Sequence, residues 1–291
     1  MIHEEKYQAL QHLLREMDSV IVAYSGGADS ALVLKVAHQV LGNRALGVIA
    51  VSASYPESER DQAVALAREI GVPVEEIRTD EMDDPNYVAN HGDRCYFCKH
   101  ELFTKLEALR QDRGFAVIAD GYNADDVGDF RPGIKAAAEQ QVRHPLQAAG
   151  LTKAEIRDIS KELRLATWDK PAMACLSSRI PHGTPIQVGM LEQVDKAEQF
   201  LRGLGFRQLR VRHHNKIARI EVEAAELPRL AEPQIRDQVV RELKRLGYAY
   251  VTVDLAGYRM GSLNATNATN ATNIVPLPMH EQQAALAVSQ Q

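Results

Sequence analysis

The chain has 291 residues, of which 45% are hydrophobic and 25% charged, and its formal net charge is −5. This length suffices for one α/β domain and a smaller second one, while the acidic balance argues against a large nucleic-acid surface, which needs many Lys and Arg side chains. No stretch approaches the roughly 18 apolar residues of a membrane span, and the first residues lack the basic flank of a signal peptide. We therefore expect a cytoplasmic protein with neither a nucleic-acid nor a membrane partner.

Residues 20–30 predict a buried strand that enters a glycine turn, and residues 31–41 predict the helix that follows. This arrangement places free backbone N–H groups beside the positive end of a helix, which is a site for an anion, usually phosphate. The turn lacks the Gly-Lys-Ser/Thr ending of a Walker loop, so transfer of a γ-phosphate is not indicated. The alternative is a glycine turn that only makes a tight corner. The expected ligand residues are Ser25, Gly26, Gly27, Ser30 and, through Mg²⁺, Asp29.

Residues 45–53 and 72–77 predict two further strands, with a helix over 57–70 between them. Alternating strands and helices predict an α/β fold with a doubly wound parallel sheet, whose ligands bind at the carboxyl ends of the strands. Ser52 ends the second strand, so we expect it beside an adenine or ribose, although ordinary polarity at a strand end explains it equally well.

Residues 80–93 predict an acidic loop, 94–110 a helix and 116–120 a fourth strand. The Gly-Tyr-Asn-Ala-Asp-Asp segment after this strand again puts polar groups at the carboxyl edge. It resembles the segment that approaches ATP and its metal in PP-loop enzymes, which implies that Asn123 and Asp126 lie near a nucleotide and its metal. The alternative is capping of a helix N-terminus, which also explains acidic residues.

Arg131 lies in a cationic turn suited to a phosphate or carboxylate, and residues 142–146 predict a short fifth strand. Thr152 opens a capping box, and the charged side chains of its helix are expected on a solvated face. Pro and Gly residues at 181–185 mark a domain boundary. The order of the elements beyond it predicts a small α+β domain. These elements are a helix over 190–203, strands over 209–213 and 217–223, a helix over 235–246 and a strand over 249–255.

The three cysteines are the second strong feature, as Cys95-x-x-Cys98 and a distant Cys175. Two thiols at this spacing can share a metal or cluster, and an odd number in a cytoplasmic chain argues against a disulfide framework. We favour a four-iron four-sulfur cluster held by three thiolates, with one iron open for a labile ligand. The alternatives are structural zinc completed by His91 or His100, a redox dithiol, and unrelated core thiols.

Six segments together resemble the LarE family, PP-loop ATP pyrophosphatases that act as sulfur transferases in making the nickel-pincer nucleotide cofactor of lactate racemase. They are the turn at 25–30, Gly-Tyr-Asn-Ala-Asp-Asp at 121–126, Arg-Pro-Gly at 131–133, Trp-Asp-Lys-Pro at 168–171, Ala-Cys-Leu-Ser-Ser-Arg at 174–179 and Tyr-Arg-Met-Gly-Ser-Leu-Asn at 258–264. The resemblance implies a PP-loop domain over 1–185 and a domain for substrate and oligomer contacts over 186–264. It leaves 265–291 as a tail, which its Asn-Ala-Thr repeat predicts to be disordered.

The resemblance also implies a reaction. ATP, with Mg²⁺, converts carboxylates of pyridinium-3,5-biscarboxylic acid mononucleotide into acyl-adenylates, and a sulfur nucleophile displaces AMP to leave thiocarboxylates. Some members carry only the cysteine matching Cys175 and give up its sulfur. Others add a Cys-x-x-Cys pair and hold an iron–sulfur cluster, and this chain matches them. Sulfide on the open iron is then the expected nucleophile, supplied as free sulfide or by a sulfur donor protein.

Further residues are assigned through this resemblance. Asp29, Cys175 and Arg179 are the expected catalytic residues, and the substrate phosphate and carboxylates are expected on arginine side chains. The family's quaternary state implies a homo-oligomer, a hexamer built from trimers. Arg210 and Arg212 match the family's substrate position, and Glu198 and Glu221 match a metal site there. Arg179, which borders Cys175, is expected to hold the substrate together with these two arginines.

Other functions compete with this one. A tRNA thiolase of the PP-loop type also uses a Cys-x-x-Cys pair and a third cysteine, but it needs a basic RNA face, which a net charge of −5 does not favour. An amidotransferase or ligase of the NAD- or GMP-synthase type needs no cysteine trio. A nucleotide-binding regulator without chemistry is the alternative from another class, and the intact Ser-Gly-Gly-Ala-Asp-Ser turn argues against it.

Overall fold

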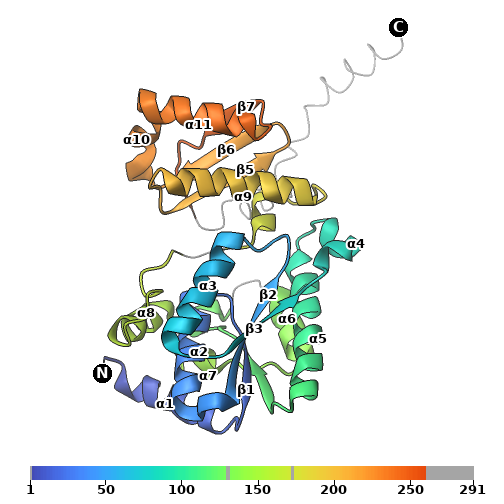
Figure 1. Ribbon diagram of the computed structural model, residues 1–291, viewed down its shortest axis with the longest axis vertical. Coiled ribbons are helices and arrows are strands. Elements are labelled where there is room, and N and C mark those ends of the chain that lie inside the picture. Colours follow the sequence, from blue (N-terminus) through green and yellow to red (C-terminus); the bar gives the residue numbers. More distant parts are fainter. Residues whose placement is uncertain (1, 129–131, 172–173, 260–291) are drawn as a thin grey trace, which may run out of the picture.

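The computed structural model describes residues 2–128, 132–171 and 174–259, and its first half is built on a parallel sheet (Figure 1). The four strands pair in the order β3-β2-β1-β4, all parallel. They are β1 (Val20–Ala23), β2 (Ala45–Val51), β3 (Val74–Arg78) and β4 (Val117–Ala119). Their carboxyl ends meet at one edge, and the pairing confirms the predicted α/β fold with a parallel sheet.

Helices cover both faces of this sheet because successive residues of β1 point to opposite sides. Val20 and Val22 pack into a core with the helices on one face, whereas Ile21 packs into the core on the other. The first set is α1 (Glu4–Arg15), α2 (Ala28–Leu41), α3 (Glu57–Ile70) and α8 (Lys153–Glu162). The second set is α5 (Arg94–Arg113) and α6 (Pro132–Glu139). The sheet is therefore doubly wound.

Two local predictions are wrong. Residues 142–146 form no strand but a single parallel bridge, between Arg143 and Ala119. Pro145 ends the pairing, because it has no N–H to donate and instead begins the short helix α7 (Pro145–Ala148). The acidic segment 80–93 also contains a helical turn, α4 (Pro85–Val88), capped by the Asp84 carboxylate, which accepts from the Asn86 N–H at 2.8 Å.

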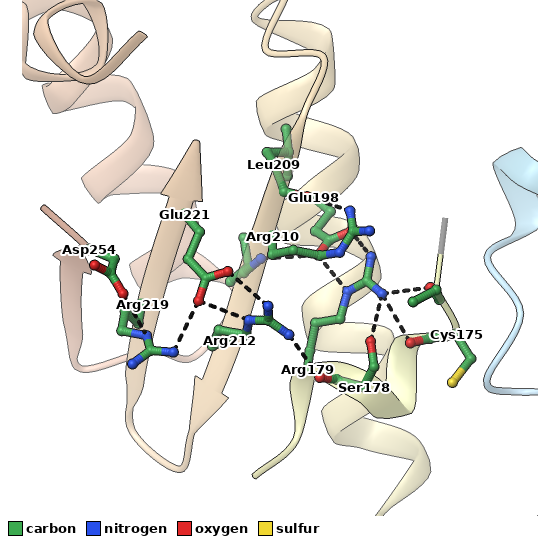
Figure 2. A network of polar contacts seen from close by, with 12 residues as sticks. Cys175, Ser178, Arg179, Glu198, Leu209, Arg210, Arg212, Arg219, Glu221 and Asp254 are labelled. Atoms are coloured by element: carbon green, nitrogen blue, oxygen red, sulfur yellow. Dashed lines mark hydrogen bonds and ion pairs between the residues drawn. The ribbon is translucent and has the colours of Figure 1, made fainter. Parts of the chain in front are cut away.

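The second half is the predicted α+β unit. Strand β5 (Leu209–His214) pairs antiparallel with β6 (Ile217–Val222), and β6 pairs parallel with β7 (Tyr250–Val253). The helices α9 (Val188–Gly203), α10 (Leu227–Ala231) and α11 (Pro233–Arg245) pack on one face of this sheet. Arg210, Arg212 and Arg219 lie on the other face, toward the first domain (Figure 2).

A shared apolar cluster joins the two units near the predicted boundary. Tyr87 of α4 and Leu176 pack with Ile186 and with Leu191 of α9. The segment that carries Cys175 therefore packs against α4 of the first unit and α9 of the second. The predicted tail and Arg131 lie outside the described residues. Within the described ranges, no helix is long and apolar enough to cross a membrane.

Candidate functional site

The glycine turn between β1 and α2 forms a compact loop at the carboxyl edge. The Ser30 hydroxyl accepts from the Ser25 N–H at 3.2 Å and lies 3.1 Å from the Ser25 hydroxyl. Gly26 has a positive φ of 67°, and a Cβ there would lie 2.6 Å from the Cβ of Ala63 in α3. Only glycine fits this position, and it lets the loop turn tightly from β1 into the N-terminus of α2, the end of a helix that favours an anion.

The segment after β4 packs directly against this loop. A Cβ on Gly121 would lie 2.8 Å from the Ser30 nitrogen and 3.1 Å from the Asp29 Cβ, so only glycine allows this approach. Asn123 and Asp126, both buried, close a short capping box. The structure therefore brings Asp29, Asn123 and Asp126 together at the carboxyl edge of the sheet.

The surroundings of Asp29 raise the pKa of its carboxyl. Burial and the neighbouring Asp126 raise its pKa to about 6, against the opposing effect of Lys153, Arg157 and Asn123. The Lys153 ammonium donates to Asp126 at 2.8 Å, so the prediction of a merely solvated helix face is wrong for this residue. A signal was present in the sequence, since a lysine in the first turn of a helix opposes the macrodipole and needs another partner.

Lys170 is a second residue that the sequence analysis did not single out. Its ammonium donates to the Gly26 carbonyl at 3.2 Å and pairs with the buried Glu59 at 2.7 Å. Arg157 donates to the Trp168 and Lys170 carbonyls and so holds the Trp-Asp-Lys-Pro segment in place. This segment therefore brings a cation to the phosphate loop.

The end of β2 connects the phosphate loop to the Cys175 segment. The Tyr55 hydroxyl donates to the Ser25 carbonyl at 3.0 Å, and the Leu176 N–H donates to the Ser54 carbonyl at 2.9 Å. The hydroxyl of Ser52, a residue expected beside the adenine or ribose, lies 3.0 Å from the Ser54 hydroxyl. The edge predicted to bind the nucleotide is thus continuous with the cysteine site.

The Cys175 segment meets the start of α5, which carries Cys95 and Cys98: the Cys175 sulfur lies 4.0 Å from Nη2 of Arg94, the residue before Cys95. Burial of its sulfur and the neighbouring Cys175 raise the pKa of Cys98 to about 12, and desolvation and Cys175 also raise the pKa of Cys95. Among the described residues, no group of three or more His, Cys, Asp or Glu side chains is arranged to hold a metal ion, and this includes the three cysteines with His91 or His100.

Arg179 lies fully buried beside Cys175 (Figure 2). Its Nε and Nη2 donate to the two carboxylate oxygens of Glu198, both at 2.8 Å. Its Nη1 donates to the carbonyls of Ala174 and Cys175 at 2.6 and 3.0 Å. The guanidinium thus connects α9 to the backbone on both sides of the cysteine.

The second sheet continues this network toward Cys175. Arg212 donates to both carboxylate oxygens of Glu221, at 3.0 and 2.8 Å, and to the Ser178 carbonyl at 2.9 Å. Arg219 also pairs with Glu221, at 3.0 Å. Burial lowers the pKa of Arg210 to about 10, with a further contribution from Arg179. Glu198 and Glu221, matched by resemblance to a metal site, are therefore each paired with arginines.

Replacing Glu198 by Gln is expected to destabilise the protein by about 3 to 5 kcal/mol, because it leaves the Arg179 charge buried without its carboxylate. Urea unfolding at pH 7 measures this. The control is Glu192→Gln on the same helix, whose carboxylate is largely exposed and lies 3.7 Å from Lys196; it should change stability by no more than about 0.5 kcal/mol. Equal effects of the two changes would contradict the role of the buried pair.

The parallel sheet, the Ser-Gly-Gly loop between β1 and α2 and the polar groups at the carboxyl edge define a PP-loop fold of the ATP pyrophosphatase type. In agreement, residues 4–91 match the NAD synthase family.

Full-length relatives narrow this class. The chain is 39% identical to the pyridinium-3,5-bisthiocarboxylic acid mononucleotide synthase of Lactiplantibacillus plantarum, over 90% of this chain and 94% of that protein. It is 44% identical to an uncharacterised Synechocystis protein, over 90% of this chain and 97% of the relative. A Methanocaldococcus jannaschii protein, also uncharacterised, is 27% identical over 89% and 99%. The chain therefore belongs to the pyridinium-3,5-bisthiocarboxylic acid mononucleotide synthase (LarE) family, which confirms the resemblance seen in its motifs.

Proposed function

We propose that this protein is an ATP-dependent sulfur transferase that converts the carboxylates of pyridinium-3,5-biscarboxylic acid mononucleotide into thiocarboxylates. One observation carries the proposal: two adjacent residues in the loop after β2 contact the cysteine segment and the glycine loop. The Ser54 carbonyl accepts from the Leu176 N–H, directly after Cys175, and the hydroxyl of the next residue, Tyr55, donates to the Ser25 carbonyl. A sulfur-bearing segment and a PP-loop thus share one edge of the sheet.

Adenylation comes first, because a carboxylate is a poor acyl donor. The loop from Ser25 to Ser30 would hold the pyrophosphate of ATP, with Mg²⁺ on Asp29. Lys170, which donates to the Gly26 carbonyl and pairs with Glu59, would hold the loop in place beside the departing pyrophosphate. Attack of the substrate carboxylate on the α-phosphate then gives the acyl-adenylate and pyrophosphate.

Three interacting thiols fit an iron–sulfur cluster better than a single ion. Each thiolate of a four-iron cluster binds a different iron, so the sulfurs need not converge on one point. Cys95, Cys98 and Cys175 would hold the cluster, and when bound it would supply sulfide as the nucleophile that displaces AMP. Cys175 itself is the competing sulfur source.

The arginines have two proposed roles. Arg179, whose donors are engaged by Glu198 and by the backbone at Cys175, would position the cysteine segment instead of holding the substrate. Arg210 and Arg212 would attract the substrate phosphate and carboxylates, since both lie on the face of the second sheet that also carries Arg219, and Arg212 reaches the Ser178 carbonyl near Cys175.

This function predicts how ATP is cut. Incubated with Mg²⁺ and the dicarboxylate substrate, the protein should form AMP and pyrophosphate in equal amounts, because a PP-loop retains the β- and γ-phosphates together. Ion-pair chromatography of the quenched reaction measures the nucleotides. ADP and phosphate would contradict the assignment, and thionucleosides in digested tRNA would favour the tRNA thiolase. We also propose a homo-oligomer, a trimer or hexamer, in the cytoplasm.

A further inference from the structure

Arg94 lies beside the three cysteines, and the proposed sulfur transfer gives it no role. It is the first residue of α5, directly before Cys95, and only 5% of it is exposed. A cation in the first turn of a helix is opposed by the helix dipole, and burying it adds a desolvation cost. Both costs must be offset by specific partners.

Those partners are three parts of the cysteine site. The Arg94 Nη1 donates to the Asn90 side-chain oxygen at 2.6 Å and to the Ser177 carbonyl at 2.9 Å. Its Nη2 lies 4.0 Å from the Cys175 sulfur, within reach of a weak hydrogen bond. Arg94 therefore contacts the cysteine that arrives from a distant part of the chain, while its own backbone begins the helix that carries the other two.

The side chains around Arg94 continue this connection. Asn90, fully buried, donates to the carbonyls of Pro181 and Thr184 at 2.8 and 3.0 Å. The Tyr87 and Ser177 hydroxyls are hydrogen-bonded at 2.6 Å. These bonds join residues 87–94 to residues 177–184. Arg94 lies where the two segments come together, next to Cys95 in sequence and within 4.0 Å of the Cys175 sulfur.

We propose that Arg94 is the positioning residue of the sulfur site: it fixes Cys175 against α5 and supplies positive charge to whatever anionic sulfur the three cysteines hold. The inference rests on the proposed function only for naming the cysteines as the sulfur site. A cluster on three thiolates is negatively charged, and hydrogen bonds to its sulfurs raise its reduction potential. Removing Arg94 should therefore loosen the Cys175 segment and also make a bound cluster harder to reduce.

Hydrogen exchange of the iron-free protein tests the first effect. In Arg94→Gln, the amides of Leu176, Ser178 and Ile180 should exchange about tenfold faster or more, because a charge-assisted bond to the Ser177 carbonyl is lost. Arg94→Lys keeps the charge but cannot bridge Asn90, Ser177 and Cys175, so it should exchange faster too. The control is Arg113→Gln at the other end of α5, where a half-exposed guanidinium pairs with Glu75 at 3.1 Å; it should leave these amides unchanged.

The reduction equilibrium tests the second effect after anaerobic reconstitution with iron and sulfide. Arg94→Gln should shift the reduction equilibrium about tenfold toward the oxidised cluster, which is 59 mV for a one-electron couple. Arg94→Lys keeps the positive charge, so its reduction equilibrium should lie close to that of the unaltered protein. Unchanged exchange at residues 176–180 in both Arg94 variants would overturn the positioning role, and Arg94→Lys alone decides it where Arg94→Gln does not fold. If the unaltered protein binds no iron, the cluster proposal fails and the exchange result still decides the inference.

Discussion

Asp29→Asn is expected to reduce pyrophosphate release about a hundredfold or more and, at the same time, to make the protein more stable at pH 7.5. The loss follows from the proposed role of the carboxylate in holding Mg²⁺ at the phosphate loop. The gain follows from the environment, since burial and the Asp126 carboxylate both disfavour a charge on Asp29 and raise its pKa to about 6.

The sign of the pH dependence is fixed by this shift. Because the folded pKa of about 6 lies above the unperturbed value of 3.8, the folded state binds more protons than the unfolded state between these values. Stability is therefore lost as the pH rises from about 4 through the folded pKa of about 6, by about 3 kcal/mol in all. Lys153 and Arg157, which oppose the shift, and Asn123 are the other polar groups that act on this carboxyl.

Thermal unfolding in metal-free buffer checks this prediction. At pH 7.5 the melting temperature of Asp29→Asn should exceed that of the unaltered protein by about 4 °C or more, and the difference should vanish near pH 4, where the carboxyl is protonated. Asp61→Asn is the control, because Asp61 on α3 is exposed and pairs with its neighbour Arg60, so the variant's melting temperature should stay close to that of the unaltered protein. A variant less stable than the unaltered protein at pH 7.5 would contradict the argument.

The second large effect concerns the three cysteines as a unit. If Cys95, Cys98 and Cys175 together hold a cluster, replacing any one by Ala leaves an iron without its thiolate. Each variant should then lose iron, acid-labile sulfide and thiocarboxylate formation together. Anaerobic iron and sulfide analysis with the visible spectrum measures the first two, and mass spectrometry of the product measures the third.

The competing sulfur source predicts a different pattern. If Cys175 gives up its own sulfur, Cys95→Ala and Cys98→Ala would retain a single turnover, and Cys175 would lose roughly 34 Da, the mass of hydrogen sulfide, as it becomes dehydroalanine. We expect Cys175 at full mass after several turnovers supplied with sulfide. A turnover-dependent loss of mass at Cys175 would refute delivery from a cluster even if iron is present.

The sequence predicted the parallel sheet and the phosphate loop well because both rest on local signals. Apolar runs of strand length, a helical stripe after Ser-Gly-Gly and glycines at the turn are sufficient for β1, the loop and α2. Where a local signal was ambiguous, prediction was wrong: Val142 to Leu146 has strand-forming residues, but Pro145 lacks the N–H that pairing requires. The position of Asp126 at the edge was predicted, whereas its partner Lys153 was not.

What the sequence determined by itself is the class of fold, the family and the residue types of the site, because these are carried by short motifs in fixed order. Only the tertiary structure decided which charges meet. Arg94 and Arg179 are 81 and 4 positions from Cys175 along the chain, yet both hold its segment, and Glu198 and Glu221 prove to be arginine partners. The physical reason is that a buried charge is stabilised by the polar groups that the fold places within about 3 Å of it. These partners come from separate parts of the chain, so no periodicity or fixed spacing in the sequence predicts them.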